Sequence, residues 1–89
     1  MPDYPITGYF AAIRTRADRA MIRDEWIVMT VTTPEREELQ SDGRIRRWRR
    51  IPEAGGRALR VILLEDGATV HNAFFDRDFE DLTDASSVF

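Results

Sequence analysis

Two Asp-Gly pairs constrain the fold of this chain more than any other feature, because each can close a β-hairpin within two residues. They are Asp42-Gly43 in "SDGR" and Asp66-Gly67 in "EDGA", and "PEAGG" offers a longer glycine loop between them. Asp-Gly suits the two-residue turns whose twist matches that of antiparallel strands. The second half of the chain is therefore predicted to form a four-stranded meander, with strands at residues 36–41, 44–51, 57–65 and 68–75.

The first half of the chain carries helical patterns. In "GYFAAIRTRADRAMI", Phe10, Ile13, Ala17 and Met21 recur at the spacing of one helix face, and Thr7 is a suitable N-cap. This spacing predicts one amphipathic helix along the whole stretch.

A second helix is predicted in "DEWIVMTVTT". Asp24 is a suitable N-cap, Trp26 and Met29 keep helical spacing, and Pro34 would end the helix. The β-branched residues of this stretch would also suit a strand. We favour a helix of about two turns, because both the cap and the spacing agree. Two helices followed by four strands predict an α+β fold in which the helices cover one face of the sheet.

Composition bounds the class of protein. The chain has 89 residues, no cysteine and one histidine. This length suffices for one small core. With no cysteine and a single histidine, we expect no disulfides, no transition-metal site and no cofactor. No apolar run reaches the roughly 20 residues of a membrane span, so no membrane contact is expected and the cytoplasm is the expected compartment. We predict a single domain at residues 1–79 and an acidic tail at residues 80–89.

Charge is segregated along the chain, although its formal net charge is only -3. All 13 basic residues are arginine, and residues 44–60 hold seven of them against one acid, Glu53. Residues 76–89 are acidic, with Arg77 as their only base. The pattern predicts a basic sheet region and an acidic tail, which is either solvated or folded back to compete with a bound anion.

The Asp-Gly turns also predict strand register. A two-residue turn at residues 66–67 would place Arg60 and His71 diagonally on the side away from the core. The opposite, apolar face would hold Leu59, Val61, Leu63, Val70 and Phe74, with Leu63 opposite Val70 and Leu59 opposite Phe74.

The turn at residues 42–43 would set Glu38 opposite Arg47. On the strand that follows, Trp48 shares a face with Arg46 and Arg50, and neither face is cleanly apolar. Trp48 either points into the core, with both arginines extending outward along their stems, or lies outside among them. The pattern leaves both arrangements open.

The stretch "DGRIRRWRRIPEAGGRALRVILLEDGATVHNAFFDRDF", together with "DRAMIRDEWI", resembles a small bacterial and cyanobacterial domain family similar to BrnT- and RelE-type toxins. The likeness spans residues 9–79. It implies a RelE-like fold and a toxin-like endoribonuclease, or an RNA-binding component of a toxin–antitoxin pair. Arg77 stands where BrnT-like chains carry the arginine that closes the last strand, and Arg60 begins the strand paired with it. Tyr9 stands where relatives carry a histidine.

Metal-independent RNA cleavage needs proton transfer and cations aimed at the phosphate. His71 is the candidate proton-transfer residue, with Glu37 or Tyr9 as its complement. Arg60 and Arg77 are the candidate phosphate-stabilising residues of this catalytic set. The candidate RNA-binding residues are Arg46, Trp48 and Arg50, with Arg46 also able to face the phosphate and Trp48 able to stack on an unpaired base.

Each of these residues also has a purely structural interpretation. His71 would be a neutral imidazole on a half-exposed strand, Trp48 a core or interface residue, and the arginines a solvated strand face. The alternative function is a non-catalytic protein-binding or dimerisation module, which the apolar Ile62 and Leu64 favour. The expected partners are accordingly a cognate antitoxin, RNA or the ribosome, or a second copy of the chain.

Overall fold

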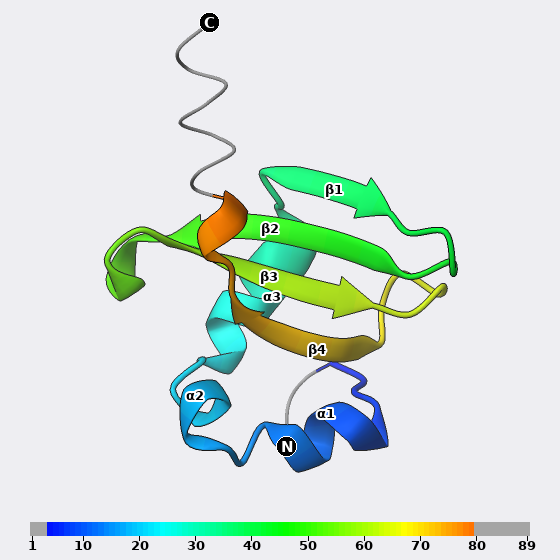
Figure 1. Cartoon of the computed structure of the whole chain (residues 1–89), viewed down its shortest axis with the longest axis horizontal. Helices are drawn as coiled ribbons and strands as arrows, with labels where there is room; N and C mark the ends of the chain where they lie inside the picture. The colour runs from blue at the N-terminus through cyan, green and yellow to red at the C-terminus, as the bar shows by residue number, and fades with distance from the viewer. Residues whose placement is uncertain (1–3, 80–89) are drawn as a thin grey trace, which may run out of the picture.

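The computed structural model of the chain describes residues 4–79. Its four strands form one antiparallel sheet in the order β1-β2-β3-β4, with helices at one face and one edge (Figure 1). The α+β class and the meander are as predicted, and the acidic tail at residues 80–89 lies outside the described residues. The elements are α1 (Gly8–Ile13), α2 (Ala17–Ala20), α3 (Asp24–Thr32), β1 (Arg36–Leu39), β2 (Ile45–Ile51), a 3-10 turn (Pro52–Ala54), β3 (Arg57–Leu63) and β4 (Val70–Phe75).

Two short helices, α1 and α2, replace the single first helix that the spacing predicts. Thr7 is the N-cap, as predicted, and its Oγ1 accepts the backbone N–H of Phe10 at 3.1 Å. The helix ends at Ile13 and the chain turns before α2 begins. Because this turn changes the direction of the chain, Ile22 enters the core while Met21 stays 54% exposed. The predicted apolar stripe is therefore wrong beyond Ile13.

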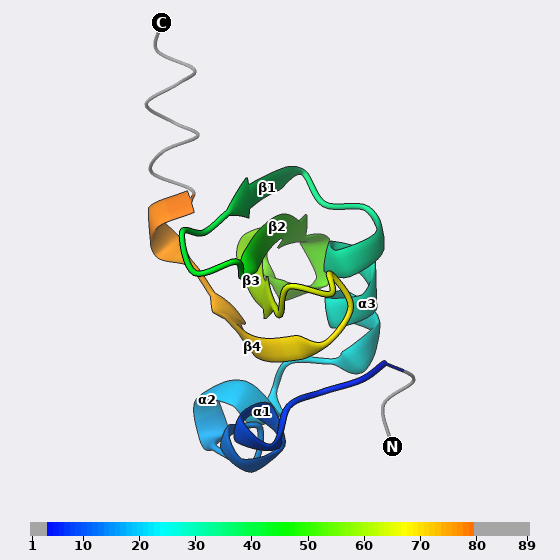
Figure 2. The ribbon, with the colours of Figure 1, turned by 90° about the vertical axis from the view of Figure 1, so that its right-hand side faces the viewer.

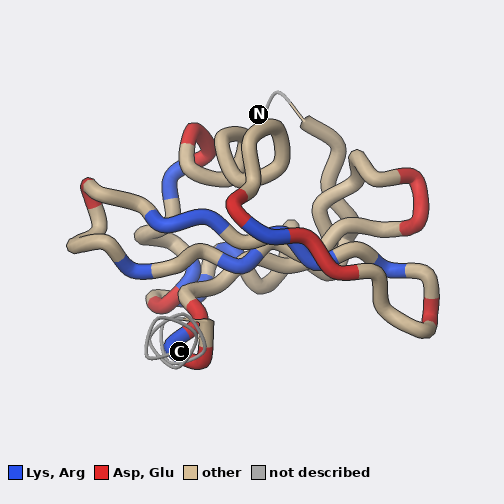
Figure 3. The backbone as a smooth tube through the Cα atoms, turned by 90° about the horizontal axis from the view of Figure 1, so that it is seen from above, with Lys and Arg blue, Asp and Glu red and all other residues tan. Residues whose placement is uncertain are grey.

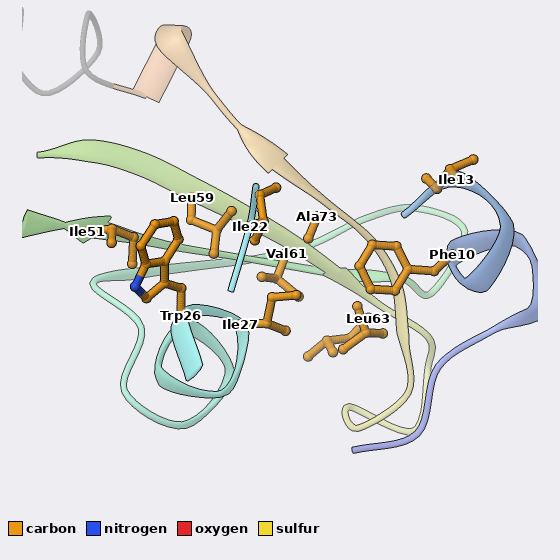
Figure 4. Close-up of a cluster of buried hydrophobic side chains, with 11 residues drawn as sticks. Phe10, Ile13, Ile22, Trp26, Ile27, Ile51, Leu59, Val61, Leu63 and Ala73 are labelled. Atoms are coloured by element: carbon orange, nitrogen blue, oxygen red, sulfur yellow. The ribbon is translucent and has the colours of Figure 1, made fainter. Parts of the chain in front are cut away.

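The ambiguous second stretch is the helix α3, as predicted. Its N-cap is Arg23 rather than Asp24, which is the first helical residue. Thr30, one of the β-branched residues, is buried and its hydroxyl donates to the Trp26 carbonyl at 2.8 Å. Trp26 and Ile27 point into the main core (Figure 4), whose buried residues are Phe10, Ile13, Ile22, Trp26, Ile27, Ile51, Leu59, Val61, Leu63, Val70 and Ala73.

The hairpin between β1 and β2 has a three-residue loop rather than two residues. The N–H of Gln40 donates to the Arg44 carbonyl at 2.8 Å, and Gly43 has a φ of 92°. A turn closed by a left-handed glycine uses the same Asp-Gly pair as the shorter turn. The longer loop moves the register by one residue, so Glu37, not Glu38, lies opposite Arg47.

The hairpin between β3 and β4 departs from prediction in a similar way. Leu63 does lie opposite Val70, but the register shifts between Ile62 and Leu63 at a β-bulge. Beyond the bulge Leu59 lies opposite Phe75 instead of Phe74. Phe74 therefore shares the face of Arg60, while Ala73 and Phe75 pack on the main core.

The two faces of the sheet are covered unequally. Helix α3 lies on one side, and a helical turn that begins at Arg77 lies on the other (Figure 2). Under this turn a small second cluster contains Trp48, Ala58 and Phe79. Trp48 is therefore on the face away from α3, which we call the outer face.

The α3 side of β2 carries two arginines between its isoleucines. Arg47 donates to the Val31 carbonyl at 2.8 Å and Arg49 to the Thr33 carbonyl at 2.7 Å. These carbonyls lie at the C-terminal end of α3, where backbone acceptors lack helical partners. The guanidinium groups thus serve as caps, which explains how a core-facing side of β2 tolerates them.

None of the helices within residues 4–79 is both long enough and apolar enough to cross a bilayer.

Candidate functional site

A row of alternating arginine and aromatic side chains crosses the outer face. Arg36, Trp48, Arg60 and Phe74 are successive cross-strand partners on β1, β2, β3 and β4. The guanidinium carbon of Arg60 lies 5.6 Å from the Trp48 ring centre and 5.2 Å from that of Phe74, and Arg36 lies 5.4 Å from that of Trp48. Arg19 of α2 ends the row, 5.4 Å from the Phe74 ring centre. We call these five residues the arginine–aromatic row.

Asp76 fixes the centre of this row. Its Oδ2 accepts the Trp48 indole N–H at 2.9 Å and lies 3.4 Å from the Arg60 guanidinium. Its Oδ1 accepts the backbone N–H of Asp78 at 2.9 Å, so the carboxylate caps the turn that begins at Arg77. Burial alone would raise the pKa of Asp76, but the Trp48 and backbone hydrogen bonds and the Arg60 charge lower it below its ordinary value.

Trp48 is covered in this arrangement. The turn that Asp76 caps stacks Phe79 on Trp48, with ring centres 5.8 Å apart and an interplanar angle of 15°. Trp48 is 5% exposed as a result. An RNA base would stack on Trp48, as the sequence suggested, only after displacing Phe79.

The outer face has too few carboxylates to form an ion pair with every arginine on it. Glu38 lies 3.0 Å from Arg36 and 3.7 Å from Arg46, so one acid serves two guanidinium groups. The guanidinium group of Arg50 lies over Phe79 and has no carboxylate within 4.0 Å among the described residues, although the backbone N–H of Arg50 donates to Glu35 at 2.7 Å. Figure 3 shows arginines along the middle of the sheet, while many acidic residues lie at turns and on β1.

A pocket of about 430 Å³ opens at the end of the row, between α2 and the ends of β3 and β4. Most of its residues carry no signal of a shared site in the sequence, because β4 brings them together only after the bulge. Arg57 and Arg77 belong to recognisably charged stretches, but nothing in the sequence near Arg19 signals a site. Its main lining residues are Arg19, Arg57, Phe74, Phe75, Asp76 and Arg77.

His71 lies at the other end of β4, against the start of α1. Its Nδ1 is 3.1 Å from the Thr7 Oγ1, and its ring stacks on Tyr9 with centres 4.9 Å apart. Burial and, secondarily, the charge of Arg44 lower the pKa of His71 below 6.5. Of the two suggested complements, Tyr9 is beside His71, whereas Glu37 is on β1, bonded to Arg47 at 2.5 Å.

The three residues suggested for catalysis do not converge. His71 and Arg77 are six positions apart along β4 and its continuation, which corresponds to roughly 20 Å of extended chain. Arg60 lies opposite Phe74, between them, and is bonded to Asp76. A proton-transfer residue must reach within about 3 Å of the reacting atom.

Within residues 4–79, no three histidine or carboxylate side chains are grouped closely enough to hold a metal ion.

Comparisons with protein-family models, with curated proteins and with solved structures find no match for this chain. The resemblance to BrnT- and RelE-type toxins therefore stays a prediction.

Proposed function

We propose that this protein is an RNA-binding component with a RelE/BrnT-like architecture, and that its outer face binds the RNA backbone. The arginine–aromatic row is the observation that carries this proposal. Arginine is suited to phosphate because its planar guanidinium offers several donors in a fixed geometry. Stacking on Trp48 and Phe74 orients the guanidinium groups before any ligand arrives, which lowers the entropy lost on binding.

The ligand we favour is single-stranded RNA. Its backbone is flexible enough to follow a twisted sheet, and its phosphates supply the negative charge that the outer face lacks. The resemblance to RNA-acting toxins supports RNA over DNA, and an RNA partner implies a cytoplasmic protein. A cognate antitoxin would cover the same face.

The test is fluorescence anisotropy with a labelled RNA of about 12 nucleotides bearing hydroxyl ends, at salt from about 0.05 to about 0.3 M. Arg50→Gln removes an outer-face charge without a carboxylate partner, and is expected to weaken binding roughly three- to tenfold. Arg23→Gln is the matched control, because Arg23 lies over Trp26 on the α3 side. Equal affinity of the two variants, or binding that ignores salt, would contradict the proposal.

Ribonuclease activity is a further prediction of the resemblance, supported here only by the contact between His71 and Tyr9. The same RNA is resolved on a denaturing gel after incubation with wild type and with His71→Ala. Cleavage that His71→Ala abolishes would make this protein an endoribonuclease. If the RNA stays intact with both proteins, RNA binding without cleavage is the only role that remains.

The second candidate is a protein-binding or dimerisation module. Leu39 on the edge strand β1 is 74% exposed, and Ile62 is partly exposed between Arg46 and Asn72 on the outer face. Self-association measured by sedimentation would favour this candidate if it persists at high salt and is lost in Leu39→Ser.

A further inference from the structure

We propose that the pocket lined by Arg19, Arg57 and Arg77 binds the terminal phosphomonoester of an RNA chain. We call it the arginine pocket. The inference rests on the RNA-binding function proposed above, and adds the part of the ligand that this one site recognises.

The pocket has donors that its own acids do not satisfy. Among residues 4–79, neither Arg57 nor Arg77 has a carboxylate within 4.0 Å. Arg19 is paired with its neighbour Asp18, yet its Nε is buried without any hydrogen-bond partner. Asp76, on the pocket wall, is already engaged by Trp48 and Arg60. The pocket therefore gathers three arginines whose charge its free carboxylates do not balance, which favours an anionic ligand.

The aromatic side chains of the pocket hold arginines rather than a base. Arg57 lies 4.0 Å from the Phe75 ring centre, and both Arg19 and Arg60 lie over Phe74. On its core side Phe75 packs against Trp26 with ring centres 6.2 Å apart. Because guanidinium groups already lie over these rings, the pocket is suited to read phosphate and not base identity.

A chain end fits this pocket better than an internal phosphate. A terminal phosphomonoester carries a charge of about -1.5 to -2 at neutral pH, whereas an internal phosphodiester carries about -1. Three guanidinium groups around a volume of about 430 Å³ match the more highly charged group. The carboxylate of Asp18 also lines the pocket and repels any anion, so binding requires the guanidinium groups to outweigh it. The rest of the RNA would then run from the pocket along the arginine–aromatic row.

The experiment compares three versions of one RNA of about 12 nucleotides: hydroxyl ends, a 5′-phosphate and a 3′-phosphate. We expect one phosphorylated RNA to bind at least about fivefold more tightly than the hydroxyl RNA, and the two phosphorylated arms show which end is read. Arg77→Gln should bring this ratio to about one. Arg77 is exposed, and among the described residues its side chain makes no hydrogen bond, ion pair or ring contact, so this variant should fold normally. Arg57→Gln should act in the same direction.

The matched control is Arg50→Gln, which should weaken binding of all three RNAs by a similar factor and preserve the ratio. If hydroxyl RNA binds but the wild-type ratio is one, the arginine pocket is not a phosphomonoester site, and the proposed function stands. If the ratio persists in folded Arg77→Gln and Arg57→Gln proteins, the phosphate is read elsewhere and the inference is wrong. If no RNA binds at all, both the inference and the proposed function fail. Inorganic phosphate at millimolar concentration should compete with the phosphorylated RNA and leave binding of the hydroxyl RNA largely unchanged.

Discussion

Asp76 connects two strands of the outer face to the helical turn that covers them. Its side chain is 10% exposed and joins the indole of Trp48, the guanidinium of Arg60 and the backbone of the turn that carries Phe79. Because one carboxylate holds all three, its removal should loosen the cover over Trp48 as well as the Arg60 ion pair.

Asp76→Asn is expected to lower the free energy of unfolding by about 1–3 kcal/mol. The amide supplies one acceptor oxygen where the carboxylate supplies two. The substitution also leaves the mostly buried Arg60 without its counter-charge. Urea unfolding followed by tryptophan fluorescence measures the change. Asp78→Asn makes the same chemical change at an exposed position two residues away and should be nearly neutral. Equal urea midpoints for the two variants would contradict the role given to Asp76.

His71 is the only histidine, so its titration can be followed by NMR without assignment ambiguity. We expect a midpoint below 6.5, because burial first and the charge of Arg44 second disfavour the imidazolium. Arg44→Gln should move the midpoint upward. A wild-type midpoint at or above 6.5 would show that the contact with Thr7 stabilises the charged form instead.

The lowered pKa of His71 also fixes the sign of a stability change. The unfolded chain takes up a proton near pH 6.5 more readily than the folded chain, so the free energy of unfolding should fall slightly as pH drops through this value. His71→Gln should remove this part of the pH dependence. The measurement is urea unfolding at about pH 7.5 and about pH 5.5.

The sequence allowed His71 and the arginines to be chosen as candidates, but not the acid that organises them. In "FFDRDF" the first aspartate follows a strand and precedes a helical turn, which is a recognisable N-cap position. Its bonds to Trp48 and Arg60 depend on β4 lying beside β3 in the bulged register. That information is tertiary and could not be taken from residue types or spacing.

At the scale of elements, the Asp-Gly pairs predicted where the chain turns but not how many residues each turn uses. The same pair fits a two-residue turn and a longer turn ending in a left-handed glycine, and the two differ by one residue of register. One residue is enough to exchange the faces of a strand. This is why the meander was predictable while the positions of Phe74 and Glu38 were not.

Gly43 offers a test of the observed turn. Its φ of 92° disfavours any side chain, and a Cβ there would lie 2.7 Å from the Cγ of Glu65. Gly55→Ala faces open space at a φ of 73° and should cost about 1 kcal/mol through backbone conformation alone. Gly43→Ala should cost more, and Glu65→Ala in the same chain should recover the excess. A double-mutant cycle measures the coupling between positions 43 and 65, and its absence would contradict the observed approach of Glu65 to Gly43.

At the scale of the whole molecule, a net charge of -3 conceals a separation of charge across the sheet. On the α3 side, the β2 arginines cap the helix. On the outer face, the guanidinium group of Arg50 has no carboxylate partner among the described residues, and neither do those of Arg57 and Arg77 at the pocket. The last described residue, Phe79, lies against Trp48 on that same outer face. In the sequence, Glu80 and Asp81 directly follow Phe79, and Asp84 comes three residues later.

Those acids should weaken RNA binding by repulsion. One unit charge about 10 Å from another contributes on the order of 0.4 kcal/mol in water, so three acids can lower affinity by up to about tenfold at low salt. Glu80→Gln/Asp81→Asn/Asp84→Asn should therefore bind RNA more tightly, with a gain that shrinks as salt screens the charges. Glu25→Gln/Glu53→Gln neutralises acids that lie near Trp26, on the α3 side, and should change the affinity much less. If the gain per neutralised acid is the same in both variants, net charge alone governs binding. If the tail variant gains nothing even at low salt, the acids at positions 80, 81 and 84 do not oppose RNA binding.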